Sequence, residues 1–199
     1  INDEFVNYSF SAWKGAGVSI PVFSLRSRQS WGIGEFTDIK LLVDWTVKAG
    51  LKLIQLLPIN DTTAHYNWND SYPYAAISAF ALHPIYINLQ QVAGDTYSSL
   101  IKPLRKKQKE LNELKELDYV EVLKLKLSSL KELYEVAKED FKNDIGYFEF
   151  FDLNRDWLVP YAVFSYLRDK YKTADFSKWG KNKIYDESEV QEHASPNQK

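Results

Sequence analysis

The first half of the chain places one helical pattern between two short apolar runs. The runs 17–25 and 51–57 are rich in aliphatic residues, which is typical of buried strands. Between them, apolar residues recur on several faces of a helix expected over 37–49, and Gly50 ends it. A strand, a helix and a strand with short connections form a βαβ unit. We therefore expect 17–25 and 51–57 to pair in parallel, with the helix packed outside them.

A long polar and aromatic loop, residues 60–76, follows the second run. It contains rings and carboxylates but has no helical or strand periodicity. In a parallel α/β barrel the loops that follow strands lie on the face that carries function. Because long loops without secondary structure are uncommon unless they are functional, we predict a functional role for 60–76.

The character of the chain changes near residue 97, after which leucines and charged residues alternate over 97–172 in a helical manner. Over 119–142, apolar residues recur in three- and four-residue steps, which predicts one helix. The predicted seam is Val120, Leu123, Leu127, Leu130, Tyr134, Ala137 and Phe141. This seam fits either packing within the same chain, which we favour, or an intermolecular coiled coil. A further helix is predicted over 157–167, with Asp156 near its start.

Two features indicate a piece of a longer protein. The chain opens on Ile1 and contains no methionine, and its last residues, 186–199, show no apolar periodicity and no capping motif. We expect 181–199 to be a polar segment that leads to further structure.

Composition excludes several classes of function. The 25 basic and 27 acidic residues nearly cancel, so there is no charged surface expected for nucleic acid or for a membrane. No cysteine is present, which removes disulfides and thiolate chemistry and suits a reducing cytosol. The three histidines lie at no spacing that a metal site uses, and no apolar run approaches the roughly 20 residues of a membrane span. Aromatic residues make up 15%, which indicates either a ring-rich core or rings that stack on sugars.

The pair Gly32 and Gly34 resembles a nucleotide-binding loop only superficially. The dinucleotide motif requires a third glycine where this chain has Thr37, and no acidic residue follows at the required distance. A tight turn between the first strand and the helix explains both glycines.

Four carboxylates are candidates for glycosyl chemistry: Glu35, Asp38, Asp61 and Asp70. Aspartates in loops usually form turns or caps, and Asp38 lies where a helix dipole favours an anion. No two of the four form a convincing acid and nucleophile pair by spacing. Residue patterns alone therefore indicate a parallel α/β domain with a helical insertion and an aromatic functional loop.

Several blocks of residues resemble the 4-α-glucanotransferases of the amylomaltase and disproportionating-enzyme family. They are SWGIGEFTD at 30–38, LKLIQLLPIN at 51–60, DSYPY at 70–74 with SAFALHP at 78–84, and NRDWL at 154–158 with Tyr161, Ala162 and Phe164. The blocks follow the family's order from about residue 16 to 180. The extra Tyr72 inside the aspartate-serine-proline-tyrosine block is similar to the maltose-using, plant cytosolic type.

The resemblance implies a fold and a division into domains. The fold class is α/β, a partial TIM (β/α)8 barrel with a large helical insertion. Residues 1–95 are expected to begin the barrel and to carry the substrate loop 60–76. Residues 96–180 are expected to form the helical insertion, and 181–199 the polar segment that leads to the remainder of the barrel.

The resemblance also implies a retaining transfer of α-1,4-glucan segments through a covalent glycosyl-enzyme. The family's catalytic carboxylates follow later strands, so we expect none in this chain and place them beyond Lys199. Substrate contacts are carried over to Tyr74, Asp70, Ser71 and Trp68. The expected partners are maltose, maltodextrins and glycogen- or starch-like glucan in the cytoplasm, with no cofactor, metal, nucleic acid or membrane. The alternatives are a non-catalytic glucan-binding or helical interaction domain and an α-glucan hydrolase.

Overall fold

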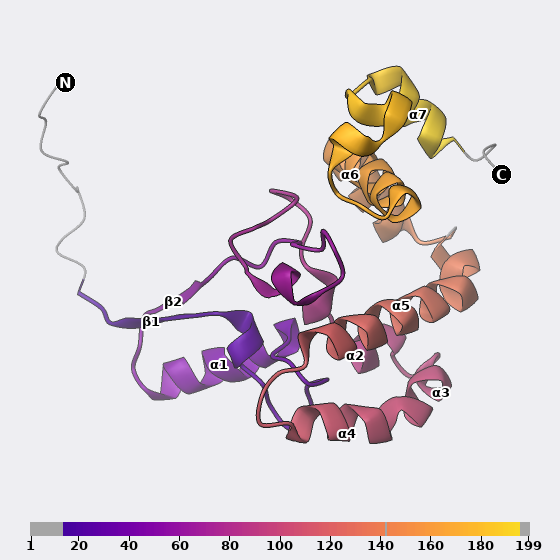
Figure 1. Ribbon diagram of the computed structural model, residues 1–199. Coiled ribbons are helices and arrows are strands. Elements are labelled where there is room, and N and C mark those ends of the chain that lie inside the picture. Colours follow the sequence, from indigo (N-terminus) through magenta and orange to yellow (C-terminus); the bar gives the residue numbers. More distant parts are fainter. Residues whose placement is uncertain (1–13, 142, 196–199) are drawn as a thin grey trace, which may run out of the picture.

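The computed structural model describes residues 14–141 and 143–195, a mostly helical chain with one small parallel sheet (Figure 1). The elements in chain order are β1 Gly17–Ile20, α1 Phe36–Lys48, β2 Leu53–Leu56, α2 Leu89–Ala93, α3 Ser98–Ile101, α4 Arg105–Glu113, α5 Tyr119–Phe141, α6 Ile145–Tyr171 and α7 Glu187–Ala194. Short 3-10 helices lie at Val22–Ser24, Trp68–Ser71, Pro84–Tyr86, Lys102–Leu104, Phe176–Lys178 and Gly180–Lys183.

The predicted βαβ unit is confirmed. Strands β1 and β2 pair in parallel, with Gly17 opposite Leu53 and Ile20 opposite Leu56, and α1 connects them. Each strand is shorter than predicted. Pro21 has no N–H to continue the ladder, and the chain turns into a 3-10 helix directly after it.

The prediction that these strands are buried is wrong. Residues of both strands alternate between exposed and half-buried, and Leu53 is 57% exposed. Helix α1 also exposes Leu41, Val43, Trp45 and Val47. Apolar faces are covered only where a second layer packs on them. The described part of the chain places too little structure against this sheet to bury it.

The core lies instead between the turn that leads into α1, the segment around Ile85 and helix α5. One buried cluster joins Val22 and Ile33 to Ile85 and to Val122 and Leu123 of α5. A second cluster packs Trp31 with residues of α2, α3 and α5. Helix α5 therefore contributes to both clusters. In Figure 1 it lies below the loop 60–76.

The single helix predicted over 119–142 is confirmed as α5, and so is its packing within the chain, on α2 and on the 3-10 helix Pro84–Tyr86. The predicted seam is confirmed at Leu123 and Ala137, which are buried, and wrong at its exposed positions. Val120 and Tyr134 are exposed, Leu127 and Leu130 are half-buried, and the side chain of Phe141 lies outside the described residues. The fully buried face consists of Tyr119, Val122, Leu123, Lys126, Ser129, Leu133 and Ala137. The full extent of this face was not predicted because it includes Lys126 and Ser129, whereas the sequence pattern counted only apolar residues.

Helices also extend beyond the predicted bounds at the C-terminal side. Helix α6 begins at Ile145, capped by the Asp144 carboxylate, well before the predicted 157. The prediction of no capping motif after residue 186 is wrong, because the Asp186 carboxylate accepts from the Glu189 N–H and caps α7. Val190 of α7 is buried against Val163, Leu167 and Trp179. The sequence signal was an aspartate followed three positions later by an acidic residue, a pattern typical of a helix N-terminus.

Candidate functional site

The loop 60–76 leaves the carboxyl end of β2 and is closed by backbone hydrogen bonds to the segment that follows it. Asn60 forms an antiparallel bridge with Leu82, and the Asp61 N–H donates to the Ala81 carbonyl at 2.9 Å. The Ile77 N–H donates back to the Asp61 carbonyl at 2.8 Å. These bonds fix both ends of the loop on the scaffold.

Asp70 organises the interior of this loop. Its side chain is buried, and its carboxylate accepts the N–H groups of His65 at 2.9 Å and Tyr66 at 2.6 Å. Its carbonyl accepts the Thr62 hydroxyl at 2.5 Å. The carboxylate thus forms a turn, as loop aspartates commonly do. It belongs to a short 3-10 helix, Trp68–Ser71, that presents the neighbouring side chains.

Besides Tyr66, three rings of the loop are exposed to solvent. Trp68 is 59% exposed, and its edge-on partner is Tyr119 of α5, with ring centroids 6.3 Å apart. Tyr72 and Tyr74 are also mostly exposed and lie 5.5 Å apart, tilted toward each other. Each ring is supported by a neighbour and leaves surface free for a ligand.

A cavity of about 170 Å³ opens beside Trp68 between the loop and the α5 entrance. Trp68, Asp70 and Ser71 line it together with Asn60, His83 and Tyr119. Tyr74 does not line it and lies on the outer surface beside Tyr72. The structure therefore brings three of the four predicted substrate residues to one cavity and places the fourth outside it.

His83 forms the polar floor of this cavity, and the sequence interpretation considered it only as a metal ligand. Its Nδ1 accepts the Ile85 N–H, so its Nε2 donates to the Tyr119 hydroxyl at 2.9 Å. Burial lowers the pKa of His83 to about 4, although the Asp61 carboxylate lies 3.8 Å from Nδ1. The ring is therefore neutral at neutral pH, and its contact with Asp61 is not an ion pair. Burial also raises the pKa of Tyr119, which keeps its hydroxyl protonated.

All four candidate carboxylates have structural partners. Glu35 contacts Lys126, and Asp38 closes a capping box at α1 by accepting the Glu35 N–H at 2.8 Å. Asp61 binds Thr63 and Tyr161, and Asp70 binds the loop backbone. No two of them face each other across a cavity as an acid and nucleophile pair would. Across residues 14–141 and 143–195, no cluster of three or more potential metal ligands occurs.

The turn that leads into α1 uses both glycines as predicted. Gly32 has φ +86, in the left-handed region that glycine tolerates, and a Cβ at Gly34 would collide with the Val22 carbonyl. These glycines shape a turn, which agrees with the sequence argument against a nucleotide site.

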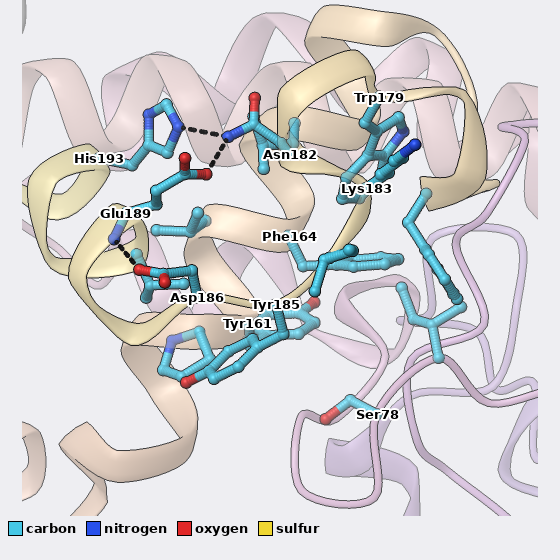
Figure 2. A pocket seen from close by; sticks show the side chains of 17 residues that line it. Ser78, Tyr161, Phe164, Trp179, Asn182, Lys183, Tyr185, Asp186, Glu189 and His193 are labelled. Carbon is cyan, nitrogen blue, oxygen red and sulfur yellow. Dashed lines mark hydrogen bonds between the residues drawn. The ribbon is translucent and has the colours of Figure 1, made fainter.

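A larger cavity of about 400 Å³ lies between α6, α7 and the segment joining them (Figure 2). Rings of Tyr161, Phe164 and Trp179 line it. At one side the Asn182 amide contacts Glu189 at 3.0 Å and His193 at 3.1 Å. This cavity was not predicted, because its lining comes from elements that the sequence did not show to be adjacent.

Comparison with known proteins identifies the family. The sequence profile of the 4-alpha-glucanotransferases matches residues 20–199. The chain belongs to the 4-alpha-glucanotransferase family. Over 171 residues it is 44% identical to the 4-alpha-glucanotransferase DPE2 of Oryza sativa subsp. japonica, covering 86% of this chain and 18% of that protein. It is 33% identical over 182 residues to the 4-alpha-glucanotransferase of Chlamydia pneumoniae, covering 87% of this chain and 34% of the relative.

The match therefore confirms the resemblance drawn from the blocks at 30–38, 51–60 and 70–84. A third relative, the 4-alpha-glucanotransferase of Chlamydia muridarum, is 30% identical over 164 residues, covering 82% of this chain and 30% of the relative. The chain spans about a fifth to a third of the length of these 4-alpha-glucanotransferases.

Among the residues that the structure describes, no helix combines the length and the apolar character needed to cross a membrane.

Proposed function

We propose that this chain supplies one wall of the glucan site of a 4-α-glucanotransferase, whose reacting carboxylates lie outside it. The observation that carries the proposal is the loop 60–76. It follows a parallel strand and is fixed at both ends. It exposes Trp68 at a cavity that also holds polar side chains, and it exposes Tyr72 and Tyr74 next to each other outside that cavity. Family membership gives this arrangement its substrate class.

The rings and the polar groups suit the two surfaces of a glucose unit. A pyranose ring presents C–H groups from its faces and hydroxyls from its edge. Trp68 and Tyr74 offer flat apolar surfaces, while Ser71 and Asn60 offer hydroxyl and amide groups close by. In this proposal Trp68, Ser71 and Tyr74 contact sugar directly. Asp70 acts chiefly by shaping the loop, since its carboxylate is bound to backbone N–H groups.

The architecture proposed for the whole protein is a (β/α)8 barrel. Residues 1–95 begin it through the parallel pair β1 and β2, and 96–180 form a helical insertion. This agrees with the short sheet, with the exposed apolar surfaces of β2 and α1, and with the helices from residue 98 onward. A closed barrel would cover the surfaces that are exposed here.

The reaction proposed is a retaining transfer between maltose or maltodextrins and a glycogen- or starch-like acceptor in the cytoplasm. A retaining pair of carboxyl groups stands about 5–5.5 Å apart across the bond that breaks. The four candidate carboxylates are held by other partners. We therefore assign the nucleophile and the acid/base to the part of the relatives' length that this chain does not span.

Incubation with maltotriose tests this proposal. The longer enzyme that contains this chain should produce glucose together with longer maltodextrins, whereas a hydrolase would produce only shorter sugars. The 199-residue chain alone should bind maltodextrin weakly and transfer nothing. Transfer by the isolated chain above a contaminant-controlled blank would overturn the assignment of the carboxylates. Binding without transfer by the longer protein would favour a non-catalytic glucan-binding module.

A further inference from the structure

We propose that Tyr161 and Arg168 of α6 are positioning residues, which hold the loop 60–76 in the form that receives glucan. The inference rests on the proposed function because it concerns the same loop. Neither side chain lines the cavity beside Trp68, so any effect on glucan binding must pass through the loop. Tyr161 lines the other cavity, between α6 and α7, where Figure 2 labels it.

Tyr161 fixes the beginning of the loop. Its hydroxyl donates to the Asp61 carboxylate at 2.6 Å across 100 positions of sequence. The other oxygen of Asp61 accepts the N–H of Thr63 at 2.9 Å and its hydroxyl at 2.6 Å. A carboxylate that is 2% exposed requires such donors, because an unpaired buried charge is unfavourable. Removing the tyrosine hydroxyl would take away the only one of these three donors that comes from α6.

Arg168 fixes the next part of the loop. One terminal nitrogen donates to the Thr63 carbonyl at 2.6 Å, and the other donates to the Tyr66 hydroxyl at 2.5 Å. The guanidinium carbon lies 4.9 Å from the centre of the Tyr66 ring. Asp169 completes the group by accepting from both Arg168 and Tyr66, at 2.9 and 2.7 Å. A planar guanidinium makes these contacts at once, which a lysine ammonium cannot do.

We call the contacts that Tyr161 and Arg168 make with the loop the clamp. Tyr66 is the loop residue whose backbone requires it. Its φ is +56, in the left-handed region that a bulky side chain seldom adopts. Such a conformation persists only where surrounding contacts determine it more than once. Here the ring and hydroxyl are held by α6, while the N–H is held by the Asp70 carboxylate. Asp70 lies in the same short helix as Trp68 and Ser71, so the contact made by α6 is transmitted to the proposed glucan residues.

The expected consequence for binding follows from the fraction of molecules whose loop is correctly formed. When only part of the population is competent, the apparent Kd rises in inverse proportion to that part. Loss of the clamp should allow Tyr66 to relax to a negative φ, which pulls its N–H away from Asp70. If one molecule in about ten keeps the loop formed, the Kd for maltodextrin rises about tenfold.

The experiment compares Tyr161→Phe and Arg168→Lys with Tyr166→Phe, a change on the same helix at a mostly exposed ring. Amide hydrogen exchange is measured on the 199-residue chain, and the binding of maltoheptaose is followed by fluorescence. The first two variants should lose about tenfold or more of the protection at His65 and Tyr66, with α5 unchanged. They should bind maltoheptaose about tenfold more weakly. Tyr166→Phe should change neither measurement. Unchanged protection at His65 and Tyr66 in both variants would overturn the inference.

A rescue distinguishes positioning from general stabilisation. Glycine adopts a left-handed φ without strain, so Tyr66→Gly added to Arg168→Lys should restore protection of the loop backbone. Lys172→Gly is the matched control, because Lys172 is the other non-glycine residue with φ +56 in the described part of the chain. It should not restore the loop. Equal recovery with Lys172→Gly would reduce the effect to overall stability and overturn the inference.

The same measurements separate the inference from the proposed function. If Trp68→Ala abolishes maltoheptaose binding but both α6 variants bind as tightly as the unchanged chain, the inference fails and the function stands. If the α6 variants lose loop protection and the unchanged chain binds no maltoheptaose, the clamp stands and the glucan site fails.

Discussion

The ammonium of Lys126 lies 2.5 Å from the carboxylate of Glu35, and neither side chain is exposed to solvent. Lys126 also donates to the carbonyls of Ile85 at 2.6 Å and Ile87 at 2.9 Å. Burial raises the pKa of Glu35 and lowers that of Lys126, while each charge opposes the shift of the other. The pair joins α5 to the entrance of α1, so it connects the helical region to the βαβ unit.

Replacing Lys126 alone should therefore be strongly destabilising. In Lys126→Met the Glu35 carboxylate stays buried without its cation, and breaking such a pair costs about 3–5 kcal/mol of unfolding free energy. Urea denaturation followed by circular dichroism measures this. The exposed neighbour Lys124→Met is the matched control and should change the unfolding free energy by less than about 0.5 kcal/mol. The double variant Lys126→Met, Glu35→Gln should be more stable than the single one, since no buried charge remains unpaired. A Lys126→Met chain as stable as the control would contradict the importance of the pair.

The buried face of α5 makes a second stability prediction. Leu123 is 2% exposed, so Leu123→Ala should lower the unfolding free energy by about 2–5 kcal/mol. Val120, which is 37% exposed, belongs to the seam predicted from sequence but not to the buried face. Val120→Ala should cost less than about 1 kcal/mol. Leu123 and Val120 both belong to the seam predicted from sequence, so equal losses in the two variants would support that seam against the observed buried face.

His83 should make stability depend on pH. Its pKa is lowered by burial to about 4 in the folded chain, from 6.5 in an unfolded one. Between these values the unfolded state binds a proton that the folded state does not, so stability falls as pH drops from about 6.5 to 4. Across this pH range the unfolding free energy should fall by a total on the order of 3 kcal/mol. Denaturation at several pH values should show this slope, and His83→Gln should reduce it. An identical slope in both chains would show that other groups cause it.

Tyr74 should matter for transfer more than for folding. Its ring is mostly exposed and lies outside the cavity, so Tyr74→Ala should change the unfolding free energy by less than about 1 kcal/mol. In the longer enzyme the same change should lower transfer from maltose about 100-fold if the ring places the sugar at the cleavage point. Tyr74→Phe keeps the ring face and should be milder. Unchanged kinetics in Tyr74→Ala would remove this residue from the proposed site.

Local patterns were sufficient for the elements that local chemistry determines. Strand and helix periodicity, together with Gly50 as a stop, predicted β1, α1 and β2 and their parallel pairing. The heptad-like spacing predicted α5 as one helix. The blocks around Asp70 and Asn154 were specific enough to indicate the family. The elements depend on neighbours within a few residues, and the pairing of the two strands follows from the short βαβ connections, so the sequence alone indicates them.

Only the tertiary structure decided which faces are buried and what the polar residues do. Lys126 lies on the buried face of α5 because Glu35, 91 positions earlier, neutralises it. Asp61 meets Tyr161 across 100 positions and Tyr66 meets Arg168 across 102, so no local pattern could indicate the clamp on the loop. The free energy of burying a charge or straining a backbone depends on partners brought together by the fold. For that reason the sequence determined the elements and the family, while the tertiary structure determined the roles of these side chains.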